Sequence, residues 1–364
     1  MGGVGGEILL VAGARPNFMK VAPLLAALRR RGRLPTALVH TGQHYDPGMS
    51  DVFFQELGLP RPDVHLGVGS DTHARQTAKI MIEFETVVLE RAPRAVLVVG
   101  DVNSTVACAL VCAKLAVRVG HVEAGLRSYD RSMPEEVNRV LTDQLSEWLF
   151  TSCEDAAPNL LREGIAPEKI HFVGNVMIDT LRQHLPRADR SGVLKRLGVS
   201  PGGYALLTLH RPSNVDDPAV LAEFLGALGR LPGQLAVLFP VHPRTRARLE
   251  ALAAPLPPAL RLLEPLGYLE FLKLLKEARV VLTDSGGIQE ETTVLGVPCL
   301  TLRENTERPV TVSEGTNVLV GGDPGRLAQE YGRVLDGHAK RGRVPKLWDG
   351  QASERIAELL ERLA

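Results

Sequence analysis

The stretch Leu282-Thr-Asp-Ser-Gly-Gly-Ile-Gln-Glu-Glu-Thr292 decides the fold that we expect for this chain. A short apolar run leads into it and predicts a buried strand, and residues 288–295 carry apolar side chains at helical spacing. Between them, Gly286 and Gly287 leave no Cβ in the way of a ligand, and Ser285 can cap the helix. The stretch therefore predicts a strand, a tight glycine turn and a helix whose free N–H groups bind phosphate.

Two acidic residues, Glu290 and Glu291, follow early in the predicted helix. They would repel a second anion, so we expect a carboxylate at this place to accept hydrogen bonds from the hydroxyls of a sugar. A plain capped turn without a ligand is the alternative for this stretch taken alone.

The composition favours a two-domain protein that binds small molecules. A chain of 364 residues is too long for a single core. Its 42 basic residues balance 42 acidic residues, so no overall field attracts nucleic acid or an anionic membrane. Aromatic residues make up 4% of the chain, which argues against stacking platforms for single strands and against a large aromatic protein interface.

The cysteines form no metal-binding or redox pattern. None belongs to a CxxC pair or lies near histidines at metal-ligand spacing, so we expect reduced thiols, no metal site and a cytoplasmic protein. The amino terminus lacks a basic region, and the apolar run of residues 8–12 is too short for a signal peptide or a membrane span. The four cysteines are Cys108, Cys112, Cys153 and Cys299.

Strands and helices alternate along the chain, which predicts an α/β fold of parallel sheets with crossover helices. Predicted strands cover 7–12, 36–41, 94–99, 117–122, 204–209, 235–240, 260–263, 279–283 and 297–302. Predicted helices cover 13–30, 47–57, 71–92, 104–115, 134–146, 217–229, 244–252, 269–277, 287–295 and 351–363. The pattern pauses near 186–191, so we expect two Rossmann-like domains, residues 1–175 and 176–350, that face a central cleft. The pattern alone leaves open where the helix of residues 351–364 packs.

A bound NAD is not predicted. The glycines of residues 2–6 precede the first predicted strand, whereas a dinucleotide fingerprint follows it. The turn that does follow, Gly13-Ala-Arg-Pro16, lacks the spacing GxGxxG.

Polar residues gather just past the predicted strands, where ligands bind in parallel sheets. In the first half these residues are Arg15, Lys20, Gln43, His44, Asp46, Asp101, Asn103, Ser104, His121, Glu123, Arg127, Glu135, Glu136 and Arg139. In the second half they are His210, Arg211, Asn214, His242, Arg244, Ser285, Arg303, Glu307 and Arg308. We interpret Asp46, Glu136 and Arg244 as caps, surface charges or helix salt bridges. The rest predict a cleft with carboxylates on the first half and phosphate ligands on the second.

An ordered set of motifs resembles the signatures of the non-hydrolysing UDP-N-acetylglucosamine 2-epimerases. The set runs from about residue 7 to the C-terminal helix, and its most specific members are HVEAGLR and DSGGIQEE. Its members are Gly13-Ala-Arg-Pro-Asn-Phe-Met-Lys-Val-Ala-Pro23, Thr41-Gly-Gln-His44, Val99-Gly-Asp101, Gly120-His-Val-Glu-Ala-Gly-Leu-Arg127, Met133-Pro-Glu-Glu-Val-Asn-Arg139, Leu209-His-Arg211, Pro240-Val-His-Pro243, Leu282-Thr-Asp-Ser-Gly-Gly-Ile-Gln-Glu-Glu291 and Thr306-Glu-Arg-Pro309. The resemblance implies a fold of the glycosyltransferase B type, a C-terminal helix that returns to the first domain, and commonly a homodimer.

The resemblance also implies a reaction, the inversion of C2 of UDP-N-acetylglucosamine to give UDP-N-acetylmannosamine. The proton on C2 is barely acidic until UDP begins to leave C1. Departure of UDP leaves a 2-acetamidoglucal, and readdition of UDP with a proton on the other face completes the epimerisation. By resemblance, neither a nicotinamide nor a metal ion is needed. The site must stabilise a developing diphosphate, transfer protons and exclude water.

The family roles carry over to matching positions of this sequence. Asp101, Glu123 and Glu135 match the proton-transfer carboxylates, without a decision on which removes and which returns the proton, and His210 matches the histidine beside the leaving diphosphate. The substrate contacts match Arg15, Lys20, Arg139 and Arg308, the diphosphate turn Ser285, Gly286 and Gly287, the ribose carboxylate Glu291, and the uracil pocket Phe271. Residues that bind a second substrate molecule as an activator in some members match Gln43, His44, Arg211 and His242.

Two departures from the family pattern leave the exact sugar open. Asn17 stands where several relatives carry glutamate, and Leu266-Gly267 replaces a more polar pair near the uracil pocket. A modified UDP-sugar is therefore an alternative substrate. Three competing functions also remain open, namely a glycosyltransferase of the same fold, a nucleotide-sugar-binding protein without chemistry, and a hydrolysing relative.

Overall fold

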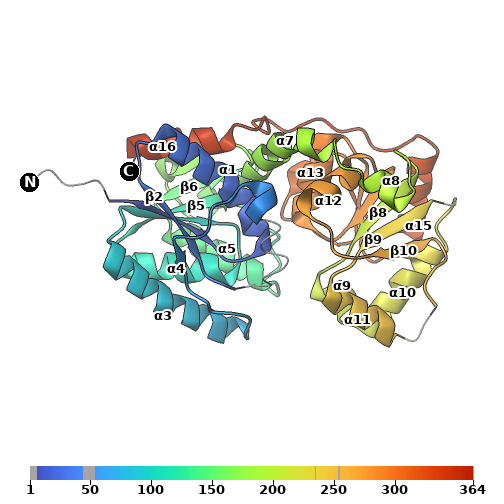
Figure 1. Cartoon of the computed structure of the whole chain (residues 1–364), viewed down its shortest axis with the longest axis horizontal. Helices are drawn as coiled ribbons and strands as arrows, with labels where there is room; N and C mark the ends of the chain where they lie inside the picture. The colour runs from blue at the N-terminus through green and yellow to red at the C-terminus, as the bar shows by residue number, and fades with distance from the viewer. Residues whose placement is uncertain (1–5, 44–53, 234, 253–254, 364) are drawn as a thin grey trace, which may run out of the picture. The chain divides into compact units, whose positions relative to one another are not determined.

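The chain folds into two compact units, each built on one parallel sheet. The computed structural model describes residues 6–43, 54–233, 235–252 and 255–363. Unit 1 consists of residues 1–183 and 346–364, and unit 2 of residues 184–345. In both units helices cover the faces of the sheet (Figure 1). The predicted α/β class with two Rossmann-like sheets is confirmed.

The sheet of unit 1 has seven strands in the order β3-β2-β1-β4-β5-β6-β7, and all of its pairs are parallel. Apolar runs predicted four of these strands because a parallel strand is buried on both faces. The other three, β3, β6 and β7, are two to four residues long, too short to leave a periodic signal. The strands are β1 (Ile8–Ala12), β2 (Thr36–His40), β3 (Val64–His65), β4 (Ala95–Val99), β5 (Arg118–Ala124), β6 (Trp148–Thr151) and β7 (Ile170–Phe172).

The helices of unit 1 lie on both sides of its sheet. α1 and α16 cover one face, and α3, α4 and α5 cover the other (Figure 1). They are α1 (Arg15–Arg31), α3 (His73–Arg91), α4 (Asn103–Lys114), α5 (Pro134–Leu145), α6 (Ala156–Arg162), α7 (Val176–Ala188, which runs on into unit 2) and α16 (Ala352–Leu363). Of the helix predicted at 47–57, the described residues 54–57 are helical.

The pause expected near residues 186–191 is partly wrong. Helix α7 continues to Ala188 with Pro186 inside it. Pro186 lacks an N–H and so cannot make the backbone hydrogen bond of its position, but the helix continues two residues past it.

The sheet of unit 2 has six parallel strands in the order β10-β9-β8-β11-β12-β13. Five of them were predicted, and the three-residue β13 was not. The strands are β8 (Tyr204–Thr208), β9 (Ala236–Pro240), β10 (Leu260–Leu263), β11 (Val280–Thr283), β12 (Cys299–Thr301) and β13 (Asn317–Leu319). The helices are α8 (Val193–Leu197), α9 (Pro212–Val215), α10 (Pro218–Gly229), α11 (Pro243–Ala251), α12 (Tyr268–Lys276), α13 (Gly286–Leu295), α14 (Pro309–Ser313) and α15 (Pro324–Leu335).

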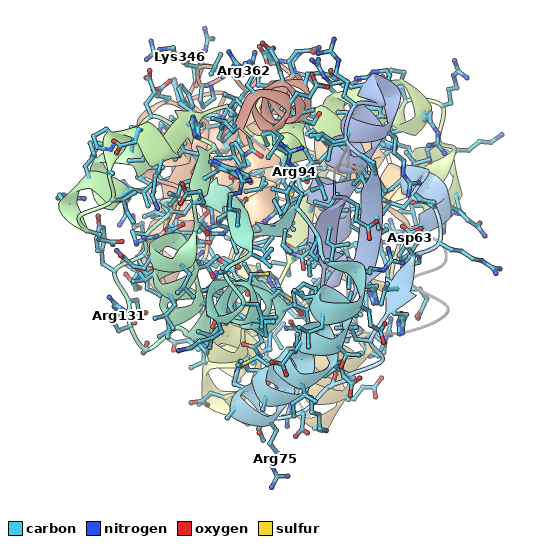
Figure 2. All side chains as sticks on the ribbon, turned by 90° about the vertical axis from the view of Figure 1, so that its left-hand side faces the viewer. Asp63, Arg75, Arg94, Arg131, Lys346 and Arg362 are labelled. Atoms are coloured by element: carbon cyan, nitrogen blue, oxygen red, sulfur yellow. The ribbon has the colours of Figure 1, made fainter. Side chains whose placement is uncertain are left out.

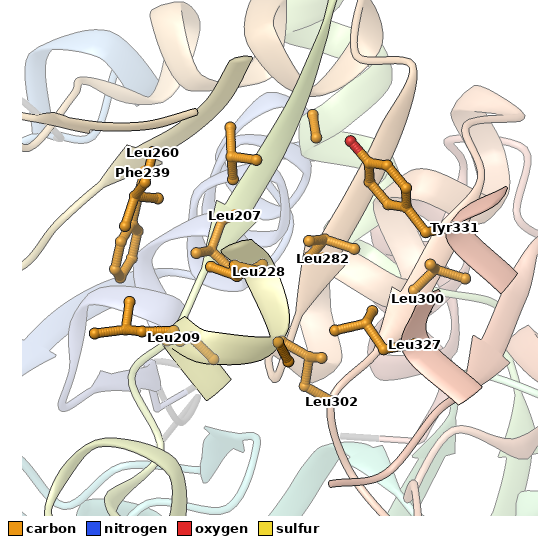
Figure 3. Close-up of a cluster of buried hydrophobic side chains, with 14 of the residues drawn as sticks. Leu207, Leu209, Leu228, Phe239, Leu260, Leu282, Leu300, Leu302, Leu327 and Tyr331 are labelled. Carbon is orange, nitrogen blue, oxygen red and sulfur yellow. The ribbon is translucent and has the colours of Figure 1, made fainter. Parts of the chain in front are cut away.

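Successive residues of the central strands of unit 2 pack into two separate hydrophobic cores, one on each face of the sheet. Leu207 and Leu282 pack on one face with Leu300, Leu327 and Tyr331 (Figure 3). Their neighbours in the strands pack on the opposite face against α12 and α13; they are Leu206 and Val281. Side chains alternate along a strand, so an unbroken apolar run is needed to fill both cores.

Each sheet has one place where the strand order reverses direction. In unit 1 the chain goes from β1 outward to β2 on one side and to β4 on the other, and in unit 2 from β8 to β9 and β11. Ligands of open parallel sheets bind beyond the carboxyl ends of the strands at this point. The residues after β1, β4, β8 and β11 are therefore the first candidates for a site.

The C-terminal helix α16 belongs to unit 1 and packs against α1. Arg31 of α1 donates two hydrogen bonds to the carboxylate of Glu361, at 2.7 and 2.8 Å. Asp179 of α7 accepts hydrogen bonds from the N–H groups of Ala352 and Ser353 and so caps the start of α16.

Many charged side chains of unit 1 lie at its surface, as Arg75 and Lys346 do in Figure 2. Within the described ranges, we find no helix with the length and apolar content that a membrane crossing requires.

Replacement of Gly174 by alanine should destabilise the protein. A Cβ on Gly174 would lie 2.1 Å from the carbonyl oxygen of Leu347, and the φ of +89° already strains any L residue. We expect the free energy of unfolding to fall by about 3 kcal/mol, measured by denaturant titration with circular dichroism.

The matched control is Gly164→Ala. Gly164 has a φ of +82° and nothing within 4 Å of a built Cβ, so it shares the strain without the clash. Its loss should be about 1 kcal/mol. Equal losses in the two variants would show that the clash contributes nothing.

Candidate functional site

Asp284 organises the carboxyl ends of β8 and β11 in unit 2. It is fully buried and follows β11 directly. Its carboxylate accepts hydrogen bonds from the backbone N–H groups of His210 and Arg211, from the side chain of Asn214 at 3.0 Å, and from Nδ1 of His210 at 2.8 Å. The loop after β8 is thus tied to the end of β11 across the point where the strand order reverses.

The pair of His210 and Asp284 leaves one imidazole nitrogen for a ligand. Burial by itself would raise the pKa of Asp284, but hydrogen bonds from His210, Arg211 and Asn214 lower it below its usual value. The ionised carboxylate orients Nδ1–H of His210, and the histidine side chain is 58% exposed. Its Nε2 can therefore meet a ligand.

The glycine turn begins α13 as predicted, with one difference. Ser285 is the N-cap residue, but its side chain makes no capping hydrogen bond to the described residues. The N–H groups of Gly286 and Gly287 also lack an acceptor within the described ranges. These donors, at the positive end of a ten-residue helix, form an anion site.

Buried arginines flank this turn. A Cβ on Gly286 would lie 2.3 Å from Nη1 of Arg308 and 2.7 Å from Oε1 of Glu307, so a larger residue would displace these two side chains. Arg308 pairs with Glu307 at 2.5 Å and with Glu290 at 2.8 Å. Glu290 and Glu291 are both buried, with exposed fractions of 1% and 2%, and the carboxylate of Glu290 pairs with Arg308. Arg303 and Arg211 also pair with Glu307, which leaves three guanidinium groups around two carboxylates.

Glu291 lies in α13 after the glycine turn, and its pKa is raised. Burial raises the pKa of Glu291 to about 7; a hydrogen bond from Tyr268 opposes this shift and the charge of Glu290 adds to it. The hydroxyl of Tyr268 donates to Oε1 of Glu291 at 3.0 Å. Phe271 lies one turn further along α12, half-buried against the core.

In unit 1, Glu123 and Lys20 form a buried ion pair beside Gly100, the residue after β4. A Cβ on Gly100 would lie 3.0 Å from Nζ of Lys20 and 3.4 Å from Oε2 of Glu123. Asn17 lies beside this ion pair and close to Gly100. Its side chain accepts hydrogen bonds from the N–H groups of Gly13 and Ala14 and donates to the carbonyl of Val99 at 3.1 Å. Asn17, a departure from the family pattern, thus joins the ends of β1 and β4.

A β-bulge aims the carboxylate of Glu123. The pairing of β5 with β6 shifts between Val122 and Ala124, and Glu123 has a φ of +77°. A bulge bends a strand and redirects a side chain. A non-glycine residue keeps such a φ only when its surroundings enforce it, and strain of this kind concentrates at functional sites.

Arg139 connects two acidic residues of this half of the site. Its guanidinium lies 2.5 Å from Asp101 and 2.5 Å from Glu136. Glu136 is buried and also accepts hydrogen bonds from the N–H groups of Ser128 and Tyr129, so the predicted helix salt bridge is confirmed, in a buried form. The side chain of Asp101 is 26% exposed.

Glu135 differs from these paired acids. It is half-buried in the first turn of α5 and has no ion-pair partner in the described part of the chain.

Each unit contains one set of candidate site residues. The anion half-site of unit 2 consists of His210, Asp284, Ser285, Gly286, Gly287 and Arg308. The carboxylate half-site of unit 1 consists of Lys20, Asp101, Glu123, Glu135 and Arg139.

The predicted activator residues divide between the units. In unit 1 the amide oxygen of Gln43 accepts hydrogen bonds from the N–H and hydroxyl of Ser104, at 3.0 and 2.7 Å. In unit 2 His242 caps α11, and Arg244 forms an exposed ion pair with Asp216, as interpreted from the sequence. Arg211 contacts Glu307.

Three of the predicted residues cannot be placed. His44, Asp46 and the side chain of Arg15 lie outside the described residues.

The sequence analysis missed Asp284 and Asn17 as organisers of the site. Their partners are up to 74 and 82 residues away in sequence, so spacing could not reveal them. The available signal was position, since Asp284 lies directly beyond the strand predicted at 279–283 and Asn17 lies five residues beyond the strand predicted at 7–12. Among the described residues, no group of three His, Cys, Asp or Glu side chains is arranged to hold a metal ion.

Comparison with known proteins identifies similar chains over nearly the whole length. A family model described as UDP-N-acetylglucosamine 2-epimerase matches residues 26–361. The chain is 43% identical to the UDP-N-acetylglucosamine 2-epimerase of Methanocaldococcus jannaschii over 97% of this chain and 98% of that protein. It is 42% identical to the UDP-2,3-diacetamido-2,3-dideoxy-D-glucuronate 2-epimerase of Pseudomonas aeruginosa over 98% of this chain and all of that protein. A crystal structure of the Methanocaldococcus jannaschii enzyme with UDP-GlcNAc and UDP superposes with a TM-score of 0.89 at 42% identity, covering 98% of this chain and 99% of the other.

The raised pKa of Glu291 predicts a pH dependence of stability. Between its ordinary pKa of 4.5 and its folded pKa of about 7, the folded protein holds a proton that the unfolded chain has lost. The contribution of Glu291 is therefore most favourable at low pH and is lost as pH rises through this window. Relative to Glu291→Gln, the wild-type free energy of unfolding should fall by roughly 3 kcal/mol across the window, measured by denaturant titration at several pH values.

Glu250→Gln is the control, because Glu250 is an exposed glutamate of α11. Its stability should follow the wild-type pH curve. A Glu291→Gln curve parallel to that of the wild type would refute the assignment of the titration to Glu291.

Proposed function

Because the chain belongs to the UDP-N-acetylglucosamine 2-epimerase family, we propose that the residues of its two half-sites carry out the reaction of this family. The enzyme is an isomerase that interconverts UDP-N-acetylglucosamine and UDP-N-acetylmannosamine. The family match over residues 26–361 carries this assignment. It agrees with the family predicted from the sequence motifs.

The reaction requires two kinds of group. The C–H bond at C2 becomes acidic only as the bond from C1 to the UDP oxygen breaks, since positive character then develops at C1. The electrons of the C1–O bond leave with UDP, and those of the C2–H bond form the double bond of 2-acetamidoglucal. UDP then adds back to C1 while a proton enters C2 from the opposite face. An anion site and proton-transfer groups must therefore act on one substrate.

We assign the departure of UDP to the anion half-site. The N–H groups of Gly286 and Gly287 and the start of α13 favour the charge that develops on the diphosphate. His210, oriented by Asp284, donates Nε2–H of its protonated imidazole to the leaving oxygen and so lowers the barrier to bond cleavage. Arg308 adds a positive charge beside Gly286.

We assign the proton transfers to the carboxylate half-site. Glu123 and Asp101 are held by the cations of Lys20 and Arg139, which keeps both carboxylates in fixed places. Glu135, half-buried and without such a partner in the described ranges, is the third member. One carboxylate removes the proton from C2 and another returns it to the opposite face, because inversion requires delivery from both sides of the ring.

The remaining contacts hold the nucleotide or a second substrate molecule. We propose that Arg15, Lys20 and Arg139 contact the nucleotide sugar, that Glu291 accepts hydrogen bonds from the ribose and that Phe271 lies at the uracil. Gln43, His44, Arg211 and His242 are proposed to bind a second UDP-sugar as an activator. We place the enzyme in the cytoplasm, in keeping with its four free, buried cysteines.

A modified sugar is the second candidate substrate. The Pseudomonas aeruginosa relative, named for a diacetamido glucuronate, is 42% identical, close to the 43% of the Methanocaldococcus jannaschii enzyme. The ratio of kcat/KM for UDP-N-acetylglucosamine and for the diacetamido uronate decides between them.

Incubation with UDP-N-acetylglucosamine in deuterated water should place one deuterium at C2 of both epimers. Proton removal and return through exchangeable carboxylates requires this label, and nuclear magnetic resonance detects it. The epimer should accumulate as a UDP-sugar, because UDP is added back. Unlabelled epimer would exclude the elimination mechanism, and free N-acetylmannosamine would identify a hydrolysing enzyme.

Asp101→Asn is the matching variant, and it should slow both epimerisation and labelling by about 10²- to 10⁴-fold. Asp336→Asn, at an exposed aspartate, should leave both rates unchanged.

We further propose that the enzyme is a homodimer joined through the surface of α3 and α5. This surface exposes large apolar side chains, Ile82 and Leu89 at 65% each, Val137 at 38% and Leu141 at 48%. An open groove of about 470 Å³ lies between the two helices. Apolar patches of this kind mark protein interfaces.

Leu141→Glu should convert the dimer to a monomer, because a buried unpaired carboxylate opposes association. Light scattering after size exclusion measures the mass. Leu161→Glu is the control, since Leu161 has the same exposed fraction of 48% but lies on α6. Dimer formation by both variants would exclude this surface.

A further inference from the structure

His121 is buried behind the carboxylate half-site and contacts no solvent. It lies on β5, two residues before Glu123, and its exposed fraction is 0%. Its Nε2 lies 2.8 Å from the carbonyl oxygen of Gly100, and its Nδ1 lies 2.6 Å from Oδ1 of Asp143. A carbonyl oxygen only accepts hydrogen bonds, so Nε2 of His121 donates to Gly100.

The peptide that His121 contacts is the one that precedes Asp101. The N–H of Gly100 donates to the carbonyl of Val122 at 3.1 Å, and its carbonyl accepts from His121. Gly100 has a φ of +67°. With both ends of this residue held, the plane of the peptide that leads into Asp101 is fixed.

Asp143, which contacts His121, also binds the residues that follow Glu123. Oδ2 of this fully buried residue accepts from the N–H of Gly125 at 3.1 Å and from Arg127 at 2.7 Å. Arg127 in turn forms two hydrogen bonds to Glu163, at 2.8 and 2.6 Å. Asp143 therefore binds the side chain of His121 in β5 and the backbone of Gly125 just after β5, on either side of Glu123.

These hydrogen bonds of Asp143 explain how Glu123 keeps its strained backbone conformation. Its φ of +77° costs free energy that the surroundings must offset. The bonds of Asp143 to both flanks of the bulge hold it open. Loss of the bond from the N–H of Gly125 to Asp143 should let the bulge relax and turn the carboxylate of Glu123 away.

We propose that His121, held by Asp143, is a positioning residue that places the carboxylates of Asp101 and Glu123 for proton transfer. The proposal rests on the proposed function and deepens it. Neither His121 nor Asp143 can touch a substrate, because both are fully buried. They act only through the peptide of Gly100 and the bulge at Glu123.

Two substitutions of His121 separate positioning from a general structural role. The side-chain amide of Gln reaches the place of Nε2 and keeps the bond to Gly100, whereas that of Asn reaches the place of Nδ1 and keeps the bond to Asp143. Each variant therefore loses one of two buried hydrogen bonds. Thermal unfolding of both shows whether they are equally destabilised.

His121→Asn should lower kcat for epimerisation by about 100-fold, because a shift of about 1 Å in a reacting group has this effect. KM for the UDP-sugar should change less than about twofold, since the anion half-site lies on other strands. His121→Gln should retain kcat within about fivefold. The isotope effect on kcat with substrate deuterated at C2 should increase in His121→Asn, because proton transfer becomes rate-limiting.

Equal kcat values and isotope effects in the two variants would overturn the proposal. If His121→Asn does not fold, Asp143→Asn and Glu163→Gln replace the pair, because each removes one charge from the same chain of contacts. Asp143→Asn should lower kcat at unchanged KM, and Glu163→Gln, at the partly exposed end of the chain, should not. An Asp143→Asn enzyme with wild-type kcat would also overturn the proposal. A wild type without epimerase activity would instead refute the proposed function.

Discussion

The constraint on which both half-sites depend is that a buried polar side chain must find its hydrogen-bond partners inside the protein. Asp284 has an exposed fraction of 0% and meets this requirement with donors from the loop after β8. Asn17, at 2%, does so with the backbone beyond β1 and β4. Each of these residues lies where the strand order of its sheet reverses, so satisfying its bonds also fixes the loops that a ligand meets. Movement of these loops would leave Asp284 or Asn17 buried without hydrogen-bond partners. The free-energy cost of that state keeps the loops in place.

The same constraint explains the mixture of charges in the anion half-site. Three guanidinium groups around the start of α13 would repel one another without Glu290 and Glu307 between them. The two carboxylates offset most of that charge and fix the directions of the arginines. A net positive charge then remains beside the free N–H groups of α13. Glu291 follows Glu290 in sequence, and burial, aided by the negative charge of Glu290, raises the pKa of Glu291 to about 7.

The parts that sequence could predict are those that depend on local pattern. Strands β1, β4, β8 and β11 are apolar runs because both faces of a parallel sheet are buried, and the turn at Gly286 was visible because few residues other than glycine allow so close an approach. The short strands β3 and β13 left no periodic signal. The partners of Asp143 could not be predicted either, since they depend on register between distant strands and on a bulge that no residue type announces.

Exposure separates His210 and Asp101, which we assign to act on substrate, from the buried groups that place them. The side chains of His210 and Asp101 are 58% and 26% exposed, whereas those of Asp284, His121 and Asp143 are fully buried. A proton-transfer group must reach its substrate, and contact with solvent would leave it free to rotate. The buried partner removes that freedom without occupying the place of the substrate. Glu123 shows how strong this restraint is. A glutamate would not keep a φ of +77° unless hydrogen bonds on both sides of it, such as that from Gly125 to Asp143, held the strand.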